Sequence, residues 1–126
     1  MWTNKDYCDY ETCVALKDFG YVGSRQECEC FGAYFNFGND IFTDSLDNTE
    51  VGANEYLRVP LYLAQKWLRE EKGIIVGIIN NFTTHEFDFY VSTWDEDRCR
   101  GNKYSSYEDA LQRGIKEAVK LLKEKK

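Results

Sequence analysis

The chain has 126 residues, of which 43% are hydrophobic and 16% aromatic, and its formal net charge is −6. A chain of this length can bury roughly two-thirds of its unfolded surface in one core, so the composition excludes a disordered chain and predicts a single domain over residues 1–126. The acidic balance repels phosphate and argues against nucleic-acid binding. No apolar run approaches the roughly 20 residues that span a bilayer, so no membrane partner is expected.

The cysteines argue for a reducing compartment. Their number is odd, and the chain opens with no charged and then apolar leader, so neither a disulfide framework nor secretion is indicated. We therefore expect a cytoplasmic protein. The five cysteines are Cys8, Cys13, Cys28, Cys30 and Cys99.

The first half of the chain predicts one helix and one strand pair. The helix runs over residues 9–20, with Asp9 as its cap and Gly20 at its end. Residues 30–37 alternate as a strand, with Phe37 among the side chains on its core side, and a turn leads to an antiparallel partner at residues 41–43. The acidic segment 44–58 is predicted to be a loop.

The second half predicts a helix, a hairpin and a final helix. Proline suits the first position of a helix that opens at Val59–Pro60 and stops at Gly73, with Trp67 on its buried stripe. Residues 74–79 are apolar on both faces, as in a central strand, and residues 87–94 return beside them. The last helix begins at Ser105 or Ser106. Its predicted buried stripe consists of Leu111, Ile115, Ala118 and Leu122.

The order of these elements is α-β-β-α-β-β-α. It predicts an α+β fold with one four-stranded, mainly antiparallel sheet that is packed by helices. Two copies could also pair through an edge of this sheet or through an aromatic face.

Motifs that carry catalysis or hold cofactors are not found in the sequence. The one histidine, His85, falls in a turn, where a solvated side chain is the simpler interpretation. The cysteine spacings do not match a zinc ribbon, so free thiols are favoured over a metal site. Acidic clusters such as residues 95–97 lack the spacing of a calcium loop. We therefore expect no metal, no cofactor and no enzymatic activity.

Four aromatic residues fall on faces that the periodicity assigns away from the core. Such side chains can mark a contact with another protein, or they can form a second buried layer if the sheet is covered on both faces. The sequence leaves both interpretations open. The four residues are Tyr34, Tyr62, Tyr90 and Trp94.

Two segments carry a resemblance to a known group of proteins. Residues 64–70 read AQKWLRE, and residues 104–110 read YSSYEDA. With the glycine-stopped first helix, they resemble small proteins that phages, prophages and mobile elements of gut bacteria encode. No activity is assigned to that group, so the resemblance implies a phage or prophage source and no function. The cysteines and the acidic segment 44–58 depart from its pattern.

These observations favour a non-enzymatic accessory protein that binds a host or phage protein. One alternative is an acidic decoy or inhibitor of a host defence protein that binds nucleic acid, because the chain outside residues 116–126 carries a net charge of −9. A third hypothesis is an enzyme that uses a cysteine or a pair of carboxylates. It requires a concave pocket with perturbed titratable groups.

Overall fold

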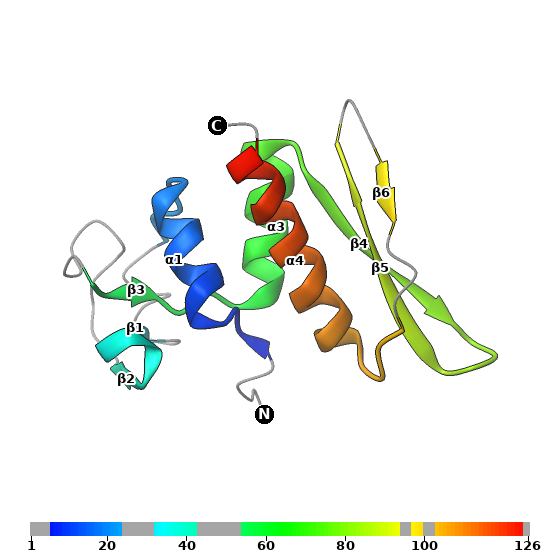
Figure 1. The fold of residues 1–126 in the computed structure, drawn as a ribbon, viewed down its shortest axis with the longest axis horizontal. Coiled ribbons are helices and arrows are strands. Elements are labelled where there is room, and N and C mark those ends of the chain that lie inside the picture. Colours follow the sequence, from blue (N-terminus) through cyan, green and yellow to red (C-terminus); the bar gives the residue numbers. More distant parts are fainter. Residues whose placement is uncertain (1–5, 24–31, 43–53, 94–96, 100–102, 125–126) are drawn as a thin grey trace. The chain divides into compact units, whose positions relative to one another are not determined.

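The computed structural model describes residues 6–23, 32–42, 54–93, 97–99 and 103–124. The chain divides into two compact units. Unit 2 comprises Tyr7–Pro60, and unit 1 comprises Met1–Asp6 together with Leu61–Lys126. Figure 1 shows their elements, and each unit is described by itself.

Unit 2 begins with the helix α1 (Tyr10–Asp18). Asp9 caps it as predicted, since its carboxylate accepts a hydrogen bond of 2.9 Å from the backbone N–H of Thr12. After the helix, Gly20 adopts a positive φ of 103°, which glycine tolerates without steric cost. The helix buries Cys13 and Leu16 completely. The predicted cap at Asp9 and the glycine after the helix are therefore confirmed, although the helix ends at Asp18, two residues before the predicted end.

A three-stranded antiparallel sheet completes unit 2. Its order is β2 (Asp40–Phe42), β1 (Ala33–Phe35) and β3 (Tyr56–Leu57). The predicted pairing of β1 with the segment near Ile41 is confirmed, because Tyr34 lies opposite Ile41. The prediction for Phe37 is wrong. This residue lies in the 3₁₀ turn η2 (Asn36–Gly38) with a φ of 56°, and its side chain is 77% exposed.

The first helix of unit 1 is α3 (Leu61–Lys72). The helix starts one residue after Pro60, and Gly73 ends it with a φ of 65°. Leu61, Ala64 and Leu68 are buried, whereas Trp67 is only half-buried. The Lys72 ammonium lies 5.3 Å from the centre of the Trp67 ring, a cation–π contact at the margin of the core.

The second antiparallel sheet has the order β4 (Ile75–Asn81), β5 (Glu86–Ser92) and β6 (Asp97–Cys99). Figure 1 shows α3 and the last helix, α4 (Tyr107–Glu124), on one side of these strands. Ser106 caps α4, because its hydroxyl accepts from the N–H of Asp109 at 3.1 Å. Most of the predicted stripe of α4 is buried, with Leu122 half-buried.

The helix α4 approaches the sheet closely at Gly114. An ideal Cβ on this glycine would lie 2.6 Å from Cγ1 of Val76 and 3.3 Å from Cβ of Phe89. Only a residue without a side chain lets the helix backbone approach the strands this closely. Val76, Phe89 and Val91 are each at most 2% exposed beneath the helix.

The prediction of an α+β fold with antiparallel strands is confirmed, but the single four-stranded sheet is wrong. Six short strands form two sheets of three in the part of the chain that the structure describes. The two unpredicted strands, β3 and β6, are two and three residues long, and β3 lies in the segment 44–58 that was predicted to be a loop. Such short strands show no alternation that a sequence pattern could reveal. Residues 74–79 were also predicted to form a central strand, whereas β4 lies at a sheet edge.

Candidate functional site

The hairpin of β4 and β5 presents two different faces. Residues directly opposite each other on antiparallel strands share a face, and successive residues alternate between faces. Val76 pairs with Val91 and Ile78 with Phe89, so these side chains form the face that α4 covers. The intervening pairs, Ile75–Ser92, Gly77–Tyr90 and Ile79–Asp88, therefore lie on the opposite face.

These three pairs are named the open face below, which comprises Ile75, Gly77, Ile79, Asp88, Tyr90 and Ser92. Ile75 is 45% exposed and Ile79 is 47% exposed, although isoleucine is among the residues most often buried. The Tyr90 ring lies across Gly77, since an ideal Cβ at that glycine would overlap Cε1 of the ring. An aromatic ring that covers a cross-strand glycine stabilises the pair and leaves its outer surface available for contact.

Two hollows lie at the ends of the open face. One has a volume of about 330 Å³ beside Ile75, and Arg69 of α3 contributes to its wall. The other has a volume of about 160 Å³ beside Ile79 and includes Asp88 and Glu86. Lys103 forms a long ion pair of 3.9 Å with Glu86. Lys103 also lines this second hollow, so acidic and basic side chains are both part of its wall.

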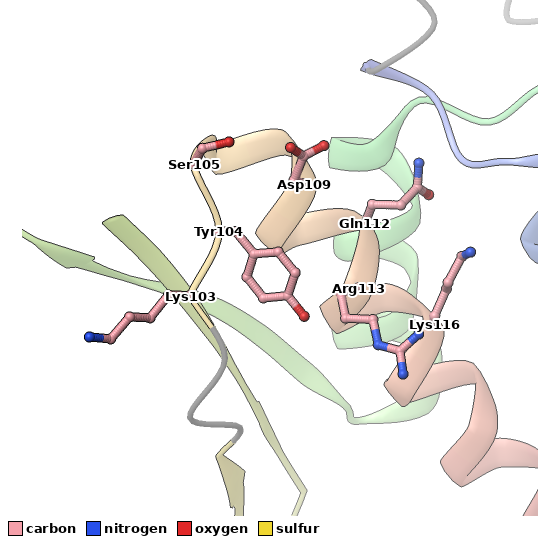
Figure 2. A pocket seen from close by; sticks show the side chains of 7 residues that line it. All are labelled: Lys103, Tyr104, Ser105, Asp109, Gln112, Arg113 and Lys116. Carbon is pink, nitrogen blue, oxygen red and sulfur yellow. The ribbon is translucent and has the colours of Figure 1, made fainter. Parts of the chain in front are cut away.

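A larger pocket of about 430 Å³ lies beside the start of α4 (Figure 2). Its cationic side chains do not converge on one point: Figure 2 shows Lys103 pointing away from Arg113 and Lys116. The guanidinium of Arg113 is also 3.4 Å from the carboxylate of Glu117, and this pairing offsets its charge. The lining contains neither a thiol nor an imidazole. It consists of Lys103, Tyr104, Ser105, Asp109, Gln112, Arg113 and Lys116.

Tyr62 lies in a fourth hollow, with a volume of about 150 Å³. Tyr62 and Tyr107 both contribute to its wall, and they are 49% and 45% exposed. Acidic side chains, Asp6 and Glu108, are also part of the lining. This hollow is small and shares no lining residue with those at the open face.

Tyr34 has a structural role in unit 2. Its hydroxyl donates a hydrogen bond of 2.8 Å to the backbone carbonyl of Cys8, and its ring meets that of Tyr10 edge-on at 6.1 Å. Cys8 and Cys13 are free and buried, and the N–H of Val59 donates to Sγ of Cys13 at 3.5 Å. Burial and the neighbouring Cys13 thiol raise the pKa of Cys8 well above its ordinary value. Such a thiol is inert, because the thiolate is the nucleophile.

The pKa of Tyr34 makes the stability of the protein depend on alkaline pH. Burial raises the pKa of Tyr34 to about 12, above the value of about 10 in an unfolded chain. The resulting stabilisation is fully present below about pH 10 and is lost as the pH rises towards about 12. We expect the free energy of unfolding from urea titrations to fall across this range. It should fall less steeply in Tyr34→Phe, and equal slopes would contradict the assignment.

Four aromatic residues were predicted to bind a partner, and the structure places the three that it describes in different parts of the fold. Tyr90 belongs to the open face, Tyr62 lies in a separate hollow, Tyr34 is engaged in unit 2, and Trp94 falls outside the described residues. Sequence reasoning missed Ile75 and Ile79, which it assigned to a buried central strand. The signal was present in the alternation of the returning strand, whose Asp88 and Ser92 lie opposite these isoleucines.

Side chains that could bind a metal ion, together with His85, give little support for a metal or histidine site in the described residues. There, no group of three or more histidine, cysteine, aspartate or glutamate side chains could hold a metal ion. His85 is exposed in the β4–β5 turn, with a φ of 57°. Cys28 and Cys30, which were predicted to be free thiols, lie outside the described residues, as do Asp95 and Glu96. Within the same limits, no helix has the length and apolar character of a membrane span.

The chain was compared with protein families, curated proteins and solved structures. No protein-family model matches the chain, and neither the curated proteins nor the solved structures give a significant match.

Proposed function

We propose that this protein is a protein-interaction module that binds its partner on the open face of the β4–β5–β6 sheet. The observation that carries the proposal is the pair Ile75 and Ile79, two isoleucines almost half exposed on a sheet face that α4 does not cover. Contact with a partner would remove this apolar surface from water, at a gain of roughly 25 cal/mol per Å². Aromatic side chains such as Tyr90 are enriched at the centres of such interfaces.

Substitution of Ile79 tests this proposal. Tagged wild-type protein is used to capture partners from a lysate of the source cells, beside Ile79→Lys and the matched control Ile41→Lys. Ile41 is 44% exposed and lies in a strand of unit 2, so the control places the same charge on a similarly exposed isoleucine. We expect a protein that wild type and Ile41→Lys retain and Ile79→Lys loses. Equal retention by all three would overturn the proposal.

The acidic decoy is the second candidate, and the distribution of charge supports it. Unit 2 contains ten acidic and three basic residues, a net charge of −7, which leaves +1 for unit 1. A nucleic-acid-binding protein would be attracted to a segment of this net charge. In the same capture experiment the decoy predicts a partner that Glu11→Lys/Asp18→Lys loses and Ile79→Lys retains. Both carboxylates lie on exposed positions of α1.

The positions of the groups with raised pKa values support an enzymatic function less than they support the binding of a partner protein. The described groups with raised pKa values are Cys8, Tyr34 and Tyr56. None of them lines any of the four hollows described above. A catalytic residue is expected to combine a perturbed pKa with a cavity that admits substrate. We also propose a cytoplasmic location, because of the cysteine pattern. The resemblance of residues 64–70 and 104–110 to phage-encoded proteins supports a phage or mobile-element origin.

A further inference from the structure

The strand β4 forms one edge of the β4–β5–β6 sheet, and some of its backbone groups point away from β5 (Figure 1). Residues opposite each other on antiparallel strands alternate between pairs that exchange two backbone hydrogen bonds and pairs that exchange none. Phe87 exchanges backbone bonds of 2.9 and 2.8 Å with Tyr104 on the far side of β5, so it exchanges none with its β4 partner, Asn80. The alternation therefore turns the backbone N–H and C=O groups of Asn80, Ile78 and Val76 towards the outer edge of β4.

The side chain of Gln65 agrees with this assignment and limits the edge. Its amide nitrogen donates a hydrogen bond of 2.7 Å from α3 to the backbone carbonyl of Val76, so α3 covers the outer edge at that residue. Among the described residues, no hydrogen bond reaches the outward backbone groups of Ile78 and Asn80. These two residues offer two donors and two acceptors to a further strand.

β4 lacks the features that usually prevent pairing at a sheet edge. Proteins protect such edges with charged side chains, prolines, bulges or very short strands. β4 has seven residues, none of them charged and none of them proline, and it pairs with β5 in one register without a bulge. The opposite edge of the same sheet, β6, is three residues long and carries Asp97 and Arg98. The sheet therefore has one protected edge and one edge that can pair.

We infer that β4 pairs with β4 of a second copy of this chain, antiparallel, about a two-fold axis that passes beside Ile79 and is perpendicular to the sheet. Ile78 of each copy then exchanges two backbone hydrogen bonds with Asn80 of the other, so every outward donor of these residues meets an acceptor. Two-fold interfaces are self-complementary in this way. The two sheets become one continuous sheet of six strands.

Gln65 and the β4–β5 turn select this register. A shift of two residues in one direction sets Asn80 against Val76, whose carbonyl Gln65 already holds. The same shift in the other direction sets Ile78 against Phe82, which lies in the turn and not in the strand. A shift of one residue sets outward backbone groups against groups that already bond to β5.

The side chains of β4 suit a second copy. Ile79 lies on the axis, directly opposite its counterpart, in a pair whose Cα atoms are about 4.5 Å apart and whose side chains are in contact. This contact removes apolar surface from water, since Ile79 is 47% exposed in the single chain. No charged side chain of β4 opposes the approach of the two strands. A foreign partner would have to present a strand with these properties, whereas every copy of the chain carries one.

The size of the contact sets the expected strength of the dimer. One strand from each copy buries much less than the 1,600 Å² or so of a standard interface. The dimer is therefore weak and reversible, and we expect it to form between about 0.1 and 1 mM. It goes beyond the proposed function and does not depend on it, because the open faces of both copies lie on the same side of the joined sheet and stay available to a partner.

Substitution of Asn80 tests the backbone pairing. Asn80→Pro removes the outward N–H and leaves the hydrogen bonds to β5 in place, because Asn80 does not bond to that strand. Asn80→Ala is the matched control, since it loses the same side chain and keeps the N–H. By sedimentation equilibrium from about 10 μM to about 1 mM, we expect wild type and Asn80→Ala to dimerise and Asn80→Pro to associate at least about tenfold more weakly. Circular dichroism checks that both variants fold.

Cross-linking tests the register and does not need the proline variant. Ile79→Cys places the introduced thiols of two copies at a Cα separation that a disulfide can bridge. Ile75→Cys is the matched control, because Ile75 is 45% exposed on the same face of β4 but would lie more than about 20 Å from its counterpart. After mild oxidation with diamide at about 0.5 mM protein, we expect a disulfide between the introduced thiols of Ile79→Cys and none in Ile75→Cys. Wild type measures the linkage that the native cysteines give by themselves.

The two experiments give clear outcomes. Dimers that Asn80→Pro weakens and Asn80→Ala retains, with the disulfide specific to Ile79→Cys, would support the inference. A wild-type protein that is monomeric at every concentration would overturn it. So would dimers that Asn80→Pro leaves unchanged, or equal cross-linking of the two cysteine variants, because the copies would then meet through another surface or register. Asn80→Pro leaves both exposed isoleucines of the open face in place, so this result is independent of the partner proposed there.

Discussion

Replacing Phe89 by alanine is expected to lower the free energy of unfolding by about 3–5 kcal/mol. Phe89 is 1% exposed and lies under α4 in the middle of β5. Its ring lies 6.2 Å from the ring of Tyr104, and its Cβ is close to the backbone of Gly114. Truncation removes the largest fully buried side chain of this hairpin and leaves a cavity that the rigid sheet and helix can fill only in part.

The same substitution at Phe82 is the matched control. Phe82 lies in the turn of the same hairpin and is 81% exposed, so Phe82→Ala should change stability by less than about 0.5 kcal/mol. Urea titration followed by tryptophan fluorescence measures both variants against wild type. Similar losses for the two variants would contradict the burial of Phe89 under α4.

The second large effect is expected at Gly114. Gly114→Val introduces a side chain where even a Cβ would lie 2.6 Å from Cγ1 of Val76, and we expect a loss of about 2–3 kcal/mol from overpacking. In an exposed helix the same substitution would slightly stabilise the protein, because valine has a higher helix propensity than glycine. The sign of the change therefore reports whether α4 contacts the sheet at this residue.

A double variant separates steric conflict from other causes. Val76→Ala removes the methyl group nearest to Gly114, so Val76→Ala/Gly114→Ala should be more stable than the sum of the two single changes predicts. Thermal unfolding of the four proteins completes the cycle. Additive losses would show that the two positions do not contact each other.

The helices follow from local sequence. Asp9 before α1, Ser106 before α4 and Gly73 after α3 act on backbone groups within one turn of the helix. Capping of this kind depends on residues only a few positions apart, so it can be predicted from the sequence. The antiparallel pairing of β4 with β5 is predictable for the same reason, since a short turn joins two segments of strand-forming residues.

The sequence by itself therefore determined the helices, the main hairpins and the α+β class, all of which depend on neighbours along the chain. Only the tertiary structure decided that the strands form two sheets, that β4 lies at an edge and that Ile75 and Ile79 face outward. Residues 74–79 are apolar on both faces, and this pattern fits a strand covered on both sides as well as one covered on a single side. The placement of α4 settles which face is buried, and it depends on Gly114, nearly forty residues further along the chain from Val76. The open face follows from that placement.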